Sequence, residues 1–209
     1  MRKKDTMSFF PQPPSSTAGQ VTASLRQDHD IIKKVLKATD ACIKLLKEGK
    51  EIPPAILLDT VDFITNFIDR CHHAKEEQGL FPALEATGMP RENSVIGTML
   101  REYEEARKIA EHIKNAVESH IQDKSEESRS KIIQYCEAYV NHIDRHILKE
   151  DTRLFIITER RLKGKENDVK KMVDSVEIEK VGGAEGRKQY EENADRFLSS
   201  VRQLGSSNN

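Results

Sequence analysis

Hydrophobic residues recur along this chain at alternating steps of three and four positions, the spacing that places them on one face of an α-helix. Four such stripes follow one another between residues 21 and 160, interrupted at residues 49–54, 82–94 and 123–125. Pro53 opens the second stripe and Ser125 the fourth, because proline is tolerated in a helix's first turn and serine is a good N-cap. Four long helices with short connections predict an all-α fold, an antiparallel up-down four-helix bundle.

The two ends of the chain depart from this pattern. Residues 1–20 are rich in proline and serine with little periodicity, so we expect a disordered leader. Residues 161–209 are more polar and carry a short stripe around Val173, then glycines, then a second stripe from Tyr190 to Leu204. We predict a C-terminal helical extension with a polar tail, packed on the outside of the bundle or on a partner subunit.

Composition narrows the class of protein further. A third of the 209 residues are charged and 5% are aromatic, a mixture that favours long amphipathic helices. The net charge of −1 favours neither nucleic acid nor an anionic membrane as a partner. Cys42, Cys71 and Cys136 are odd in number and lack CxxC spacing, which indicates packed, reduced thiols. We find neither a signal peptide nor the roughly 18 apolar residues of a membrane span, so we expect a cytoplasmic protein.

The bundle contains an internal repeat, which predicts a pseudo-twofold relation between its halves. The string HHAKEEQGLF, beginning at His72, returns 74 positions later as HILKEDTRLF, beginning at His146. Each half supplies one donor residue and then a His-x-x-x-Glu pair: His29, His72 and Glu76 in the first half, and Tyr103, His146 and Glu150 in the second.

These repeated residues lie on the hydrophobic stripes, so the bundle would bury them. A buried carboxylate is unfavourable unless it is paired or metal-bound, and two close together are more so. One His-x-x-x-Glu pair is usually just a hydrogen-bonded pair, but two copies in symmetric frames favour two bound metals. Glu76 and Glu150 could bridge them, with the histidines and Tyr103 binding terminally. Imidazole with carboxylate suits iron, manganese or zinc, and the HExxH motif of zinc peptidases is absent.

These motifs resemble the hemerythrin-like (HHE cation-binding) domain over roughly residues 21–160. The resemblance rests on His29-Asp30, on the HHxxEExxLFP string, and on a second copy in which Ile156 replaces the proline. It implies a four-helix bundle with a non-haem centre of two iron ions, usually oxo- or hydroxo-bridged. By this likeness the iron ligands are His29, His72, Glu76, Tyr103, His146 and Glu150.

Tyr103 departs from the family pattern, which usually has a histidine in the third helix. A tyrosine on a core stripe is more often simple packing, but the register of the repeat favours ligation here. A bound phenolate would favour ferric over ferrous iron, whereas reversible oxygen carriage needs a stable diferrous state. The tyrosine therefore argues against an oxygen store and favours reactions with peroxide, nitric oxide or dioxygen.

The remaining histidines and acids have weaker claims to a metal. We expect His73, about 100° around the helix from His72, to face a neighbour or solvent. His142 lies on the same face as His146 and is a candidate partner or additional ligand. His112 and His120 are expected at the surface. The acidic neighbours are expected to support the ligands or to be exposed; they are Asp28, Asp30, Glu77 and Asp151.

Three functions remain open from the sequence. The leading hypothesis is a di-iron protein that binds or turns over a small oxidant, with catalase-like or nitric-oxide-handling activity as enzymatic versions. The second is a non-enzymatic iron- or oxygen-sensing module that acts on a partner through the C-terminal helices, and the third is a metal-free structural bundle.

Overall fold

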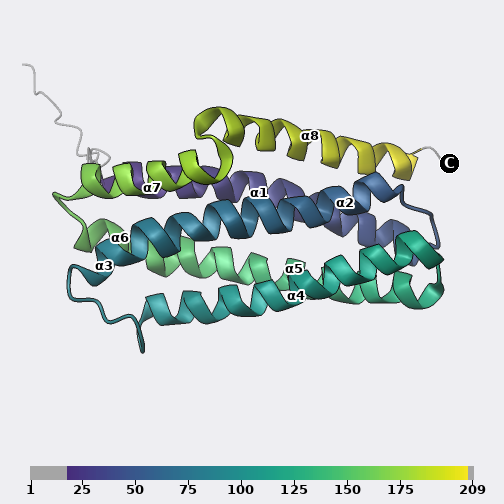
Figure 1. Cartoon of the computed structure of the whole chain (residues 1–209), viewed down its shortest axis with the longest axis horizontal. Coiled ribbons are helices and arrows are strands. Elements are labelled where there is room, and N and C mark those ends of the chain that lie inside the picture. The colour runs from purple at the N-terminus through teal and green to yellow at the C-terminus, as the bar shows by residue number, and fades with distance from the viewer. Residues whose placement is uncertain (1–17, 207–209) are drawn as a thin grey trace, which may run out of the picture.

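The computed structural model describes residues 18–206, which form a bundle of long helices flanked by two further helices (Figure 1). The helices are α1 (Ala18–Lys47), α2 (Pro54–Asp62), α3 (Phe81–Glu85), α4 (Val95–Asp123), α5 (Glu126–Lys149), α6 (Phe155–Arg161), α7 (Glu166–Val181) and α8 (Ala184–Ser206). Three π-helical segments complete them: η1 (Phe63–His73), η2 (Glu76–Leu80) and η3 (Glu150–Leu154). Most of the predicted leader lies outside the described residues, and α1 begins three residues before the expected start.

Four helical rods make the predicted bundle. The first is α1, the second runs from α2 through η1 and η2 into α3, the third is α4, and the fourth runs from α5 through η3 into α6 (Figure 1). Ser125, the predicted N-cap of the fourth rod, accepts a hydrogen bond from the backbone of Ser128. Ser94 caps the third rod by accepting one from the backbone of Ile96. The all-α prediction is therefore confirmed for the part of the chain that the structure describes.

The second rod does not end at Pro82, where its stripe was expected to stop. The helix continues to Glu85, with Pro82 in the first turn of α3 directly after η2. A proline lacks the amide that an α-helix interior needs, but the first turn leaves such amides unpaired. The change from wide π turns to narrower α turns therefore accommodates the proline.

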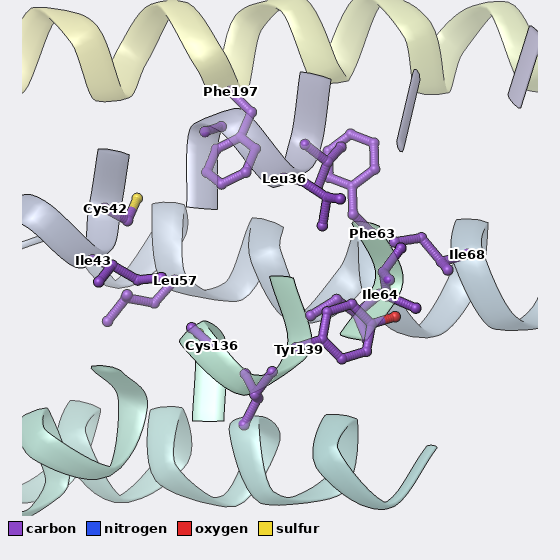
Figure 2. Close-up of a cluster of buried hydrophobic side chains, with 14 of the residues drawn as sticks. Leu36, Cys42, Ile43, Leu57, Phe63, Ile64, Ile68, Cys136, Tyr139 and Phe197 are labelled. Atoms are coloured by element: carbon purple, nitrogen blue, oxygen red, sulfur yellow. The ribbon is translucent and has the colours of Figure 1, made fainter. Parts of the chain in front are cut away.

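The extension lies along one side of the bundle. Helix α8 packs on α1 and α2, while α7 packs on η1, η2 and α1. Figure 2 shows Phe197 pointing from α8 into a large hydrophobic cluster that includes Leu36 and Phe63. The rings of Phe197 and Phe63 stack with centroids 6.1 Å apart. The extension thus buries aromatic surface that the bundle alone would leave exposed.

The hydrophobic interior is divided into two clusters along the bundle. The cluster of Figure 2 includes Ile68 and Cys71 on η1 and Ile143 on α5. The second cluster includes Leu80 at the end of η2 and Leu154 at the end of η3. Because the His-x-x-x-Glu pairs lie between these positions in both rods, the fold places a buried polar layer between the two clusters.

Candidate metal centre

Six polar side chains meet in this layer, and none of them is more than 2% exposed. The structure brings together every residue that the repeat singled out, from all four rods of the bundle. They are His29 on α1, His72 on η1, Glu76 on η2, Tyr103 on α4, His146 on α5 and Glu150 on η3.

Glu150 lies at the middle of the layer, with its two carboxylate oxygens facing different donors. Its Oε2 is 2.9 Å from His29 Nε2 and 3.7 Å from His72 Nε2. Its Oε1 is 2.7 Å from His146 Nε2 and 3.3 Å from the hydroxyl of Tyr103. Donor atoms of His29, His72 and Glu150 lie within 4.8 Å of one another, close enough to share a metal ion. The carboxylate therefore separates two groups of donors.

Glu76 and Tyr103 form the second close pair of the layer. The hydroxyl of Tyr103 donates to Glu76 Oε2, while Glu76 Oε1 has no hydrogen-bond partner among the described residues. Burial and the nearby Glu150 charge hold the pKa of Glu76 well above its usual range. Burial together with Glu76 and Glu150 also raises the pKa of Tyr103 well above its usual range. Without a cation, the layer therefore holds a neutral phenol beside a carboxyl group whose protonated form is favoured by its surroundings.

Each of the three histidines has a carboxylate beside Nδ1, the ring nitrogen that faces away from the centre. Nδ1 of His29 lies 3.2 Å from Asp151, and Nδ1 of His72 lies 3.3 Å from Asp28. Nδ1 of His146 lies 2.8 Å from Glu102. Metal-binding histidines characteristically place the outer ring nitrogen against a carboxylate, which fixes the tautomer and leaves Nε2 free for the metal.

Several buried nitrogen and oxygen atoms that face the centre lack hydrogen-bond partners, as the donor atoms of an empty metal site do. No described residue gives them a hydrogen bond, although all are buried; they are Nε2 of His29, His72 and His146, Oε1 of Glu76 and Oε2 of Glu150. Orphaned buried polar atoms are rare, because each loses its hydration without compensation. The phenol of Tyr103 donates to Glu76 and Glu150, and Nε2 of His29 and of His146 lie 2.9 and 2.7 Å from Glu150. Imidazole and carboxylate atoms that converge in this way with few hydrogen bonds are an arrangement that bound metal cations would satisfy.

A buried lysine connects the layer with the extension. Lys75 is fully buried and pairs with Asp28, the carboxylate behind His72, and with Glu177 of α7 at 2.8 Å. Sequence reasoning missed this contact, because Lys149 occupies the equivalent position of the second half and is largely exposed at its side chain. Glu177, the partner of Lys75, lies in α7 outside the repeat, so the repeat could not indicate this pairing.

One expectation for a histidine was wrong, and another is resolved by the structure. His73, expected to face a neighbour or solvent, faces a neighbour: it is 1% exposed and its ring stacks on Tyr103 with centroids 4.0 Å apart. Its equivalent in the second half, Ile147, is likewise buried, in the regular helix α5. His120 was expected at the surface but is buried, with its Nδ1 2.8 Å from Ser128 at the end of the bundle.

The other histidines take no part in the layer as donors. His142 lies beside His146, with ring centroids 6.5 Å apart, but its Nε2 donates to the backbone carbonyl of Glu102 at 2.9 Å. It therefore supports the residue that holds His146. His112 is exposed, as expected, and stacks on Tyr135.

The fold and the buried donors define a class, namely a four-helix bundle built to bind metal cations. The chain belongs to the hemerythrin HHE cation-binding domain family, whose model matches residues 20–157. It is 24% identical over 131 residues to uncharacterized proteins from Mycobacterium bovis and Mycobacterium tuberculosis. That match covers 63% of this chain, and the chain spans about half the length of these curated relatives. No solved structure matches the chain.

A bilayer-spanning helix is not found among residues 18–206, since none of their long helices is sufficiently apolar.

Proposed function

We propose that this protein is a non-haem di-iron protein that binds or turns over a small oxidant, namely peroxide, nitric oxide or dioxygen. His29 and His72 would hold one iron and Tyr103 and His146 the other, with Glu76 and Glu150 shared between them. An oxo or hydroxo group would complete the bridge. When bound, the two irons supply redox equivalents and Lewis acidity.

The placement of Glu150 carries this proposal. Its two oxygens face separate pairs of donors, which is the arrangement a bridging carboxylate requires and a single metal does not. The family to which the chain belongs binds cations, and histidine with carboxylate suits iron. With iron bound, the carboxylates beside the histidines would accept from Nδ1–H, which fixes the tautomer that presents Nε2 to the metal.

Tyr103 favours an oxidised resting state. As a bound phenolate it would place an anionic oxygen beside Glu76 and Glu150, and anionic donors stabilise ferric over ferrous iron. This is why we propose reaction with an oxidant rather than reversible oxygen carriage.

A small molecule can approach the layer from one side of the bundle. A cavity of about 220 Å³ opens between η1 and α4, and its lining includes Asp69, His73 and Arg107. His73 contacts both Tyr103 and His146, so this cavity ends next to the second pair of donors. The apolar clusters on either side of the layer exclude bulk water from it.

Replacing Glu150 tests the bridge. In the variant Glu150→Gln we expect the iron content to fall from about two ions per chain to one or none, because the neutral amide cannot bridge two cations. The matched control is Asp144→Asn, an exposed acid on α5, which should keep full iron content. Unchanged iron in Glu150→Gln would contradict a bridging role.

Turnover is tested on the iron-loaded protein. We expect the wild type, and not Glu150→Gln, to convert hydrogen peroxide to dioxygen and water, or to reduce nitric oxide to nitrous oxide and water when an external electron donor is supplied. If neither oxidant is turned over while iron remains bound, the enzymatic version is wrong.

One observation favours a second candidate, a non-enzymatic iron- or oxygen-sensing module. The contacts from His72 through Asp28 and Lys75 reach Glu177, so the state of the layer is linked to α7. A sensor predicts that iron loading changes hydrogen exchange in α7 without any turnover. Turnover with unchanged exchange in α7 would exclude it.

A further inference from the structure

His73 borders the six-residue layer, although the repeat did not single it out. It follows His72 in η1 and has no counterpart in the second half, where Ile147 occupies the equivalent position. Its ring stacks on Tyr103 at an interplanar angle of 20° and stands nearly perpendicular to His146, with centroids 5.5 Å apart. His73 therefore lies on the side of Glu150 where Tyr103 and His146 meet.

The surroundings of His73 match those of the other three histidines. Its Nδ1 lies 3.4 Å from the carboxylate of Asp69, which Arg107 holds in turn at 2.8 Å. Its Nε2 is buried and has no hydrogen-bond partner in the described part of the chain. Because the two nitrogens lie on opposite sides of the ring, Nε2 points away from Asp69. A carboxylate on one nitrogen and an orphaned second nitrogen are the combination found in metal-binding histidines.

Packing alone gives a poor account of this residue. Ile147 fills the equivalent position with an apolar side chain, whereas an imidazole buries a nitrogen that loses its hydration without compensation. A ligand role accounts for the orphaned Nε2 and for the carboxylate of Asp69 beside Nδ1.

We propose that His73 is a further ligand of the iron that Tyr103 and His146 bind. This inference rests on the proposed function, since it assigns a donor to one ion of the di-iron pair. The two iron sites would then differ in their terminal donors. One iron would have the nitrogens of His29 and His72, and the other would have the nitrogens of His146 and His73 together with the oxygen of Tyr103.

The variant His73→Ile tests this assignment, because isoleucine is the residue that the second half carries. Loss of a nitrogen donor makes the remaining ferric iron more electron-poor. We therefore expect the phenolate-to-iron absorption band to move to longer wavelength and iron affinity, measured by chelator competition, to fall about tenfold or more. The control is His120→Asn, a buried histidine at the far end of the bundle. An unchanged band and affinity in His73→Ile would overturn the assignment.

A measurement on the wild type keeps the inference testable if His73→Ile does not fold. In the proton NMR spectrum of the iron-loaded protein, each ligated histidine should give one strongly shifted, solvent-exchangeable ring N–H resonance. Four such resonances support ligation by His73, and three overturn it.

The two proposals fail in different ways. A wild type that binds two irons and shows a phenolate band but only three shifted resonances leaves the di-iron centre intact and removes His73 from it. A wild type that binds no iron overturns both.

Discussion

At the scale of single residues, the centre depends on groups that are stable in the interior only with a partner. Tyr103 is fully buried and donates to Glu76, while Nε2 of three histidines and one oxygen of each glutamate lack hydrogen bonds. Cations would compensate all of these groups together, so the residues should behave as one unit rather than as separate pairs.

Replacing Tyr103 by phenylalanine tests the phenolate. We expect the visible phenolate-to-iron band to vanish while most of the iron stays bound through histidine and glutamate. The matched control is Tyr139→Phe, because Tyr139 is also buried but lies in the cluster of Figure 2. If the spectrum of Tyr103→Phe equals that of the wild type, Tyr103 only packs in the interior and does not bind iron. The argument against oxygen carriage then fails.

Iron binding should become stronger as the pH rises. In the metal-free layer the pKa values of Glu76 and Tyr103 are raised, mainly by burial. Burial lowers the pKa of His146, but Glu150 and Glu102 outweigh it and raise that pKa to about 10. Each of these groups therefore holds its proton to a higher pH than usual, and iron must displace these protons, so affinity increases with pH.

Proton release measures this linkage directly. Adding ferric iron to unbuffered metal-free protein at neutral pH should release protons, and Tyr103→Phe should release about one fewer than the wild type. Equal release by both proteins would contradict binding as phenolate.

At the scale of elements, the π-helical segments determine which side chains reach the centre. His72, Glu76 and Glu150 all lie in η1, η2 or η3, where wider turns replace the α-helical spacing. Such turns occur often at functional sites. His72 and His73 are both buried in η1, as the equivalent His146 and Ile147 are in the regular helix α5, so burial of two neighbours does not itself require π turns.

The contact between Lys75 and Glu177 couples the extension to the bundle. In Glu177→Gln the buried ammonium group of Lys75 keeps its ion pair with Asp28 but loses its second carboxylate partner. We therefore expect the free energy of unfolding to fall by about 1.5–3 kcal/mol. The measurement is urea unfolding of the metal-free protein. Glu179→Gln, an exposed acid on the same helix, is the control and should change little. Equal stability of both variants would show that α7 is not held through Lys75.

The periodicity of the sequence was sufficient for the rods and their caps, because burying one face of each helix is what drives this fold. The repeat was likewise sufficient to find six side chains that meet in one layer. The stacking of His73 on Tyr103 was not predictable from helical spacing, which left open whether a neighbour or solvent covers a residue about 100° around the helix from His72. The pairing of Lys75 with Glu177 was not predictable either, because it depends on how α7 packs on η2.

At the scale of the whole molecule, two hydrophobic clusters enclose one polar layer, and the extension covers part of the bundle. The close approach of α7 depends on Gly79, where an added Cβ would lie 3.2 Å from the backbone of Val173. Iron loading and docking of the extension should therefore both contribute to the stability of the same folded unit.

The three cysteines provide a test of this packing. Burial raises the pKa of each thiol to about 12, and all of them lie in the cluster of Figure 2. We expect Cys42, Cys71 and Cys136 to resist a thiol reagent at pH 8 in the native protein and to react together on unfolding. Rapid labelling of the native protein would contradict the packing of this cluster.

The measurement that tests the central claim most directly is metal analysis combined with a visible spectrum of protein purified from iron-supplemented cells. The di-iron proposal predicts about two irons per chain, with absorption bands from oxo- or phenolate-bound ferric iron. Protein that contains no metal, or only zinc, and that shows no visible band after iron addition would contradict it.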